Sequence, residues 1–305
     1  MKKIKIISTY VVAIMCILST LFIQPKETEV FKTSTEESNK IMIYMLDKDR
    51  DLVPVTMNVS KKESNEENIL VLFDLMKQDF NIHEFSSLVP KSIQCFDVNI
   101  DDDIVKLNFN EAFLAMNSKN ELRFIEGIVN SIIQLNPNYK VEFYVNEQKI
   151  NKMPLSQLPV AQFDYRLGVN NFKLDDDNLH KSVSRQVVEL KSNDISEYYV
   201  VKTVRTFDED VLSFVNNVLD DISMDLECLK IDANDEEWVL HLNEKFLLEE
   251  NTIDQDKIIP LLYTLKMNQL SNHYVIKIND EVVRIDGFEN ESFAFHDLNL
   301  NIFEE

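Results

Sequence analysis

The stretch from residue 105 to residue 150 reads VKLNFNEAFLAMNSKNELRFIEGIVNSIIQLNPNYKVEFYVNEQKI. Its main features return later in the chain as WVLHLNEKFL from Trp238, DQDKIIPLLYTLKMNQL from Asp254 and HYVIKINDEVVRI from His273. The register is constant at 133 residues for the following pairs: Asn110 and Asn243 (243 minus 110), Asn146 and Asn279 (279 minus 146), Cys95 and Cys228 (228 minus 95). Three matches in one register indicate an internal duplication.

The first copy alternates predicted strands and helices. Apolar residues at every second position predict strands over 41–45 and 53–57, around a polar turn, and further strands over 94–100, 104–109 and 141–145. Apolar residues at helical spacing predict helices over 66–78, with Ile69, Leu70, Phe73 and Met76 as the stripe, and over 121–135. We therefore expect an α+β domain, a mixed sheet with two helices on one face.

The second copy follows the same order. Strands are predicted over 187–190, 198–204, 227–231, 238–242 and 274–278, and helices over 208–222 and 254–270. The loop over 79–92 of the first copy is longer than its counterpart by about nine residues in our alignment. Pro260 is tolerated in a helix only near its start, so this helix is expected to begin later than its counterpart.

Both copies resemble the GerMN domain family of sporulation and spore germination proteins. The resemblance rests on LVPVTMNV at 52–59, NFNEAFL at 108–114, IVNSIIQL at 128–135 and the closing pattern V-x-F-x-V-N at 141–146. It covers residues 39–152 well and 184–287 weakly. It implies two tandem domains, each with a compact fold similar to the ring-building motifs of sporulation-complex proteins.

The N-terminus has the features of a membrane anchor. Lysines at positions 2, 3 and 5 precede a run without charge over residues 6–23, which as a helix would be about 27 Å long, close to the hydrocarbon thickness. A cleaved signal peptide is the main alternative, and a lipoprotein anchored at Cys16 lacks the small residue expected before the cysteine. The favoured topology keeps the N-terminus in the cytoplasm and both domains outside.

The predicted organisation has six parts. They are a signal anchor (1–24), a flexible tether (25–39), the first GerMN-like domain (40–152), a linker (153–183), the second, divergent domain (184–287) and a tail (288–305) that forms an edge strand or a docking segment.

Composition excludes several functions. A net charge of -22 argues against nucleic acid and anionic lipid as partners, because both attract basic surfaces. With only 3 glycines, the chain has no glycine-rich phosphate cradle, so no nucleotide cofactor is expected. No CxxC pair and no cysteine and histidine cluster has the spacing of a zinc site.

Cysteines and acidic runs each have a structural and a chemical interpretation. Cys95 and Cys228 are interpreted as core residues in preference to a disulfide. Asp47, Asp49 and Asp51 have the spacing of a calcium loop but lack its glycine and its final glutamate, so a solvated turn is favoured. Residues 101–103 and 175–177, both runs of aspartate, are interpreted in the same way.

Histidines and glutamates do not form a recognisable catalytic set. The histidines are scattered at His83, His180, His241, His273 and His296. Glu111 and Glu244 are an acidic pair at equivalent positions, interpreted as strand-end or helix-capping residues rather than as catalytic acids. No catalytic, cofactor-binding or metal-binding residue is predicted, and the binding residues stay unassigned.

A partner surface is predicted where Tyr198, Tyr199 and Val200 form an apolar cluster in an expected edge strand. The resemblance implies a non-enzymatic, membrane-anchored scaffold of sporulation and germination, which assembles with the channel complex between mother cell and forespore and is able to oligomerise. The alternative is an envelope protein that binds or modifies peptidoglycan.

Overall fold

The computed structural model describes residues 38–60, 62–79, 85–171, 183–193, 196–206, 210–234, 237–248, 253–268, 273–283, 292–294 and 300–303. The predicted anchor over residues 6–23, Cys16 and the run 175–177 lie outside these ranges. Among the helices of the described ranges, none combines the length and the apolar character needed to span a membrane.

The first copy opens with a hairpin of two long strands. β1 (Ser38–Leu46) and β2 (Leu52–Ser60) pair in antiparallel register, with Ile41 opposite Met57 and Leu46 opposite Leu52. Both strands were predicted from their alternating apolar residues. The six residues from Leu52 to Met57 are all buried, however, so both faces of the hairpin are covered.

Two helices follow the predicted order. α2 (Asn65–Met76) begins after Ser64, whose hydroxyl accepts from the Glu67 N–H at 3.2 Å, and α3 (Ser118–Ile133) begins after Asn117. These side chains satisfy amide groups that have no partner within the helix. The buried stripe of α2 contains Leu72, and the predicted stripe residue Leu70 is only half-buried.

The main sheet of the first copy is mixed, as predicted. Its strands are β3 (Cys95–Asp101), β4 (Ile104–Phe109), β5 (Lys140–Val145) and β6 (Gln148–Lys149), in that order. The β4–β5 pair is parallel and is connected through α3, and the other two pairs are antiparallel. Parallel neighbours need such a crossover connection.

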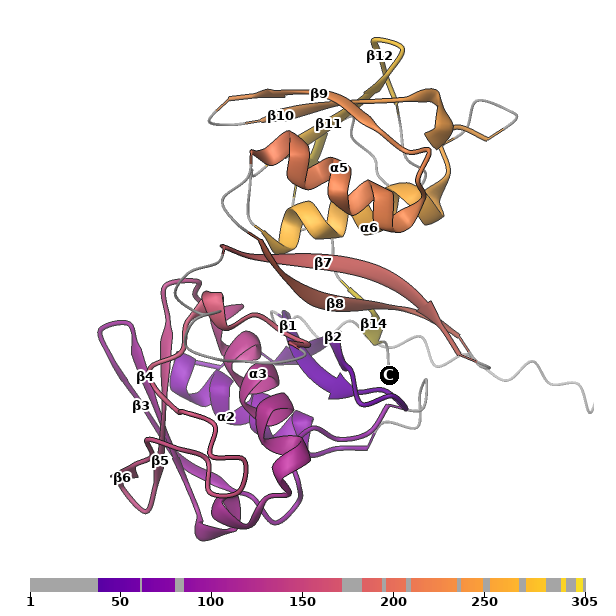
Figure 1. Ribbon diagram of the computed structural model, residues 1–305. Helices are drawn as coiled ribbons and strands as arrows, with labels where there is room; N and C mark the ends of the chain where they lie inside the picture. Colours follow the sequence, from indigo (N-terminus) through magenta and orange to yellow (C-terminus); the bar gives the residue numbers. More distant parts are fainter. Residues whose placement is uncertain are drawn as a thin grey trace, which may run out of the picture. The chain divides into compact units, whose positions relative to one another are not determined.

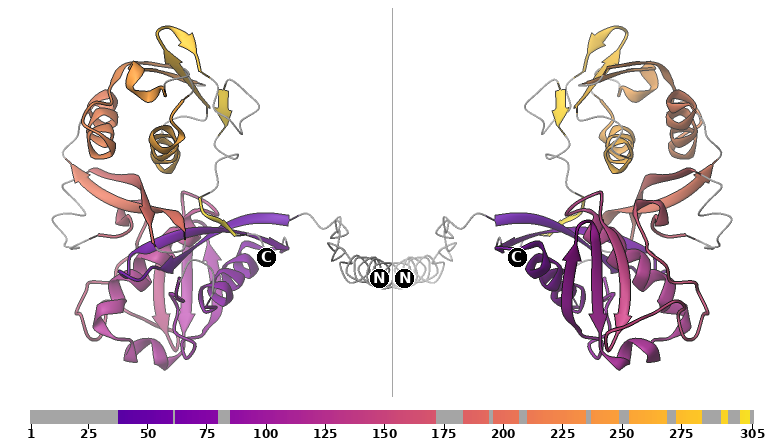
Figure 2. Two further views of the ribbon diagram at one scale, coloured as in Figure 1. Left: turned by 90° about the vertical axis from the view of Figure 1, so that its right-hand side faces the viewer. Right: turned by 90° about the vertical axis from the view of Figure 1, so that its left-hand side faces the viewer.

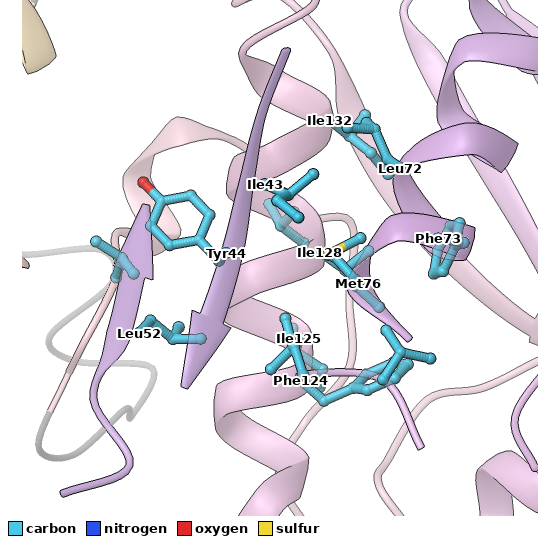
Figure 3. Close-up of a cluster of buried hydrophobic side chains, with 14 of the residues drawn as sticks. Ile43, Tyr44, Leu52, Leu72, Phe73, Met76, Phe124, Ile125, Ile128 and Ile132 are labelled. Atoms are coloured by element: carbon cyan, nitrogen blue, oxygen red, sulfur yellow. The ribbon is translucent and has the colours of Figure 1, made fainter. Parts of the chain in front are cut away.

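The helices lie between the hairpin and the mixed sheet (Figure 1). α3 contacts β1 on one side and β5 on the other, and α2 contacts β1 and β3. Figure 3 shows Ile43 of β1 directed toward Ile128 and Ile132 of α3, next to Leu72 of α2. The α+β class is confirmed, but the expectation of one sheet per copy is wrong, because the hairpin is a separate layer over the helices.

The second copy repeats this order of elements. Its helix α6 begins at Gln255, four residues beyond the position equivalent to Ser118 (118 plus 133 is 251), which confirms the predicted later start. Pro260 nevertheless lies within α6, at its sixth residue. The elements are β7 (Val183–Ser192), β8 (Glu197–Thr206), α5 (Val211–Ile222), β9 (Cys228–Ala233), β10 (Trp238–Leu242), α6 (Gln255–Met267), β11 (His273–Ile278), β12 (Glu281–Val282) and β13 (Ser292–Ala294).

The loop difference between the copies is larger than our alignment suggested. Residues 77–94 connect α2 to β3 and residues 223–227 connect α5 to β9, so the difference is 13 residues (18 minus 5) instead of nine. The longer connection also contributes buried side chains to the first core, including Phe85, Leu88 and Val89.

Two segments outside the repeats pack against the first copy. From the segment expected to link the copies, Met153, Val160, Phe163, Leu167 and Val169 are buried in the first core. The tail contributes β14 (Ile302–Phe303), which pairs in parallel with β2 (Figure 2). The tail therefore adds a short third strand to the sheet of β1 and β2.

Candidate functional site

The glutamate of the repeated Asn-Glu motif accepts the same side-chain hydrogen bond in each copy. The Asn146 side chain donates to Glu111 at 3.1 Å, and its equivalent Asn279 donates to Glu244 at 2.8 Å. Glu111 opens the short helix η1 (Glu111–Ala115), and Glu244 opens η3 (Glu244–Phe246). Each glutamate therefore joins the end of β4 or β10 to the turn after β5 or β11, which agrees with the predicted strand-end role.

The amide before each glutamate makes a second repeated bridge. The Asn110 Nδ2 donates to the Ser92 carbonyl and the Asn243 Nδ2 to the Asp225 carbonyl, both at 2.9 Å. Serine 92 and aspartate 225 are also 133 residues apart (225 minus 92). The motif found in the sequence is thus a structural element present in both copies.

The two repeat cysteines are free thiols in the cores. Cys228 is buried, and Cys95 is partly buried against the first core. Burial raises the pKa of the Cys95 thiol to about 12 and that of the Cys228 thiol to about 11. Since the thiolate is the reactive form, both cysteines are poor nucleophiles at neutral pH.

We therefore expect slow alkylation of both thiols. In the full chain carrying Cys16→Ser, iodoacetamide at pH 8 should modify Cys95 and Cys228 more than tenfold more slowly than after unfolding in urea. Mass spectrometry of the intact protein over time measures the rate of modification in the folded protein and in the urea-unfolded protein. Equal rates in folded and unfolded protein would contradict the burial argument.

The aspartate turn after β1 is only in part the solvated turn that we expected, because Asp49 is exposed but Asp47 is not. Asp47 is only 4% exposed. Its carboxylate receives the Tyr198 hydroxyl at 3.1 Å and lies 3.3 Å from the Lys191 ammonium, which is 2.7 Å from Asp51. Burial opposes the charge on Lys191, but the hydrogen bond to Asp51 and the charge of Asp47 outweigh it and raise the lysine pKa to about 12. This turn of the first copy therefore binds the hairpin of the second.

The predicted partner surface on β8 is covered by the chain itself. Tyr198 and Val200 are buried in the first core, and the Tyr198 ring packs edge-on against Phe85 at 5.0 Å. Tyr199 packs against Tyr263 of α6, also at 5.0 Å. The expectation that these residues face an external partner is wrong, because Tyr198 and Val200 pack into the first core and Tyr199 packs against α6 of its own copy.

Two asparagines bridge the facing strands β2 and β8. The Asn170 amide donates to the Leu52 and Val201 carbonyls at 2.8 and 2.7 Å, and it accepts from the Leu52 N–H at 2.7 Å. The Asn301 amide donates to the Pro54 and Tyr199 carbonyls, both at 2.7 Å, and accepts from the Tyr199 N–H at 2.8 Å. Both asparagines have a positive φ, 55° and 44°. Nothing in the sequence singled them out, because asparagine is common in loops.

Removal of these two amides should uncouple the copies. We expect Asn170→Gly combined with Asn301→Gly, which preserves the positive φ, to turn one cooperative unfolding transition into two. Each lost bridge leaves backbone groups unsatisfied, at a cost of about 1–3 kcal/mol. Urea unfolding followed by fluorescence and circular dichroism measures this, with the exposed Asn99→Gly as the matched control. A single unchanged transition in the double variant would contradict the prediction.

A buried charge lies beneath the Asp47 turn. Glu126 of α3 is fully buried, with Arg123 at 2.7 Å and with the N–H and the side-chain amide of Asn171 at 2.9 and 2.7 Å. Burial raises the pKa of Glu126, while Arg123 and Asn171 partly offset that effect. Arg123 also donates to the Asn171 carbonyl at 3.0 Å, so this cluster anchors the segment that leads into the second copy.

The remaining candidates do not converge on one site. His241 lies 3.0 Å from Asp232, His273 is exposed on β11, and His83, His180 and His296 lie outside the described residues. The turn over 101–103 is exposed, as predicted, and Lys106 pairs with Asp101 at 3.0 Å. Within the described part of the chain, no three histidine, cysteine or acidic side chains are grouped as metal ligands.

Each mixed sheet has one long outer strand with the same irregularity. β3 and β9 are the end strands of their sheets (Figure 1). The pairing register skips one residue between Cys95 and Asp97 on β3, and the equivalent skip on β9 leaves Leu229 without a cross-strand partner. The bulged residues are Phe96, 54% exposed, and Leu229, 57% exposed, again 133 residues apart (229 minus 96).

Comparison with known proteins agrees with this architecture. Residues 42–151 match the model of the Germane family, described as sporulation and spore germination. No curated protein matches the chain. Among solved structures, the tandem GerMN domains of the sporulation protein GerM from Bacillus subtilis match with a TM-score of 0.67 and 18% identity, over 80% of this chain and 92% of that one.

Two further solved structures match over smaller parts. The first GerMN domain of the same Bacillus subtilis protein matches with a TM-score of 0.37 and 17% identity, over 41% of this chain and 97% of that one. A putative lipoprotein from Clostridium perfringens matches with a TM-score of 0.30 and 21% identity, over 44% of this chain and 95% of that one. The similarity to the tandem structure shows that the two copies together have the tandem GerMN fold.

Proposed function

Because residues 42–151 belong to the Germane family of sporulation and spore germination domains, we propose that the chain is a non-enzymatic scaffold that acts in these two processes. The observation that supports this role best is the coupling of the two domains into one unit. A scaffold presents binding surfaces at a defined spacing, which requires that its domains do not move independently.

The contacts between the copies have the character of a permanent interface. Asp47 and Tyr198 are buried where the copies meet, and the Asn170 and Asn301 amides use both donors and the acceptor across the two strands. Buried polar groups that are fully paired in this way specify one arrangement of the parts. The second copy therefore acts in the proposal as a rigid extension of the first.

The proposal places both domains outside the cell membrane, with the N-terminal segment as the anchor. The partners would then be envelope proteins of the sporulating cell, in particular the channel complex between mother cell and forespore. With a net charge of -22, the chain is a poor ligand for anionic lipid surfaces, which favours proteins as its partners.

The test is crosslinking in the native cell during sporulation, together with imaging of a fluorescent fusion to the full chain. Enrichment at the engulfing septal membrane and a crosslinked sporulation protein are the expected results. A uniform envelope signal without any crosslinked protein would refute the scaffold role. Incubation of the protein with cell-wall sacculi separates the alternative: soluble fragments would indicate an enzyme, and sedimentation without cleavage a wall-binding protein.

A further inference from the structure

We propose that the outer edge of β3, with Phe96 near its start as the apolar anchor, binds an extended and positively charged segment of another protein as an added strand. The inference rests on the proposed function as a scaffold and names the surface and the chemistry of its partner. An outer strand presents backbone N–H and C=O groups that a new strand can pair with.

The chain protects two of its other strand edges from such pairing. The β2 edge is occupied by β14 and by the Asn170 and Asn301 amides. The β7 edge is capped from α6, because Thr264 accepts from the Val188 N–H at 2.9 Å and Asn268 accepts from the Gln186 N–H at 2.9 Å. No strand of the described ranges pairs with the outer side of β3.

The bulge gives this edge an apolar anchor. Phe96 has no cross-strand partner and is 54% exposed, although an aromatic side chain contributes far more to stability when it is buried. Both copies keep an exposed apolar residue at this position, despite their divergence elsewhere. Aromatic side chains at the centre of an interface contribute much of the binding energy.

The β3 edge differs from the β9 edge in its charged residues, and this difference indicates the chemistry of the partner. Asp97, Asn99 and Asp101 lie on one face of β3, and the turn adds Asp102 and Asp103. Among the described residues, only Asp101 of these acids forms an ion pair, with Lys106. Along β9 itself, by contrast, Lys230 and Asp232 pair at 2.6 Å, so this strand carries no surplus charge, although the sequence between β9 and β10 is acidic over residues 235–237.

The surplus negative charge favours a basic strand over a second copy of this chain. Two copies meeting at β3 would bring two sets of aspartates together, and like charges on neighbouring strands are destabilising. A segment with lysine or arginine at alternate positions places its charges opposite Asp97 and Asp101. The apolar residue next to the charge opposite Asp97, on the side away from Asp101, then covers Phe96.

The test uses the full chain in mild detergent and a fluorescent seven-residue peptide of alternating lysine and valine, matched to the length of β3. Anisotropy should show binding that weakens at least tenfold in Phe96→Ser and falls with salt. Leu229→Ser, the same change at the equivalent bulge, should leave the affinity unchanged. Asp97→Asn with Asp102→Asn should weaken binding and reduce its dependence on salt.

Two further peptides separate strand addition from general attraction to an acidic protein. The same sequence with N-methyl groups on alternate residues cannot complete a strand ladder and should not bind, and neither should a peptide of alternating glutamate and valine. Equal binding of the N-methylated peptide, or equal losses in Phe96→Ser and Leu229→Ser, would overturn the proposal. Sedimentation that shows self-association abolished by Phe96→Ser would replace the basic strand with a second copy.

The result can be separated from that of the cell experiment. If crosslinking captures a sporulation protein equally well with wild type and with Phe96→Ser, the scaffold role stands and the β3 site is wrong. If the peptide binds at β3 but no protein is crosslinked in sporulating cells, the scaffold role fails and the strand-binding edge stands.

Discussion

Replacement of Gly168 by alanine should destabilise the protein by about 3–5 kcal/mol, the sum of backbone strain and overpacking. Gly168 has φ 68° and ψ -167°, a conformation open essentially only to glycine. A Cβ there would lie 2.2 Å from the Thr203 Oγ1 and 2.9 Å from the Thr203 Cβ. Thr203 cannot retreat easily, because its hydroxyl donates to the Val169 carbonyl at 2.7 Å and accepts from the Val169 N–H at 2.6 Å.

Gly127→Ala is the matched control for this prediction. Its Cβ would meet the Leu88 Cδ2 at 2.3 Å, but that atom is the tip of a flexible side chain. The added methyl group also favours the helical backbone by about 1 kcal/mol, so a net loss of no more than about 2 kcal/mol is expected. Urea unfolding of the full chain in mild detergent compares the variants. A loss in Gly168→Ala no larger than in Gly127→Ala would refute the strain argument.

Arg123→Met should cost about 3–5 kcal/mol at neutral pH, because it leaves the Glu126 carboxylate buried without its cation. Burial already raises the pKa of Glu126 in the folded protein, and removal of the arginine raises it further. In the range between the unfolded and folded pKa values, the folded state binds more protons than the unfolded state, so stability falls as pH rises. The loss of stability in Arg123→Met is therefore complete at pH values above the pKa of Glu126 in the folded variant. It is absent below the ordinary glutamate pKa of about 4.3.

The double variant Arg123→Met with Glu126→Gln tests that cause. A glutamine can still accept from the Asn171 amide groups and carries no charge, so most of the stability lost at neutral pH should return. Urea unfolding at several pH values between 4.5 and 8, starting from the ordinary glutamate range, measures the difference. A loss that is independent of pH, or a double variant as unstable as Arg123→Met, would show that lost packing dominates.

The sequence alone determined the duplication, the order of strands and helices, and the similarity of residues 42–151 to the Germane family. These depend on local chemistry, because apolar periodicity fixes which face of each element is buried and the register of 133 residues follows from the letters themselves. The start of α6 beyond its counterpart also followed from one residue, Pro260. The Glu111 and Glu244 pair was interpreted correctly as structural, although its Asn146 and Asn279 partners were not identified.

Only the tertiary structure decided how the two copies meet. An acidic turn and an apolar edge look the same in sequence whether they face water, a partner or another part of the same chain. Asp47 was therefore expected in solvent and Tyr198 at an external surface, yet each is buried against the other. Asn170 and Asn301 are 131 residues apart (301 minus 170), and their shared role depends on the positions of β2 and β8 in space. No local pattern encodes such contacts, because their energy arises from groups brought together only by folding.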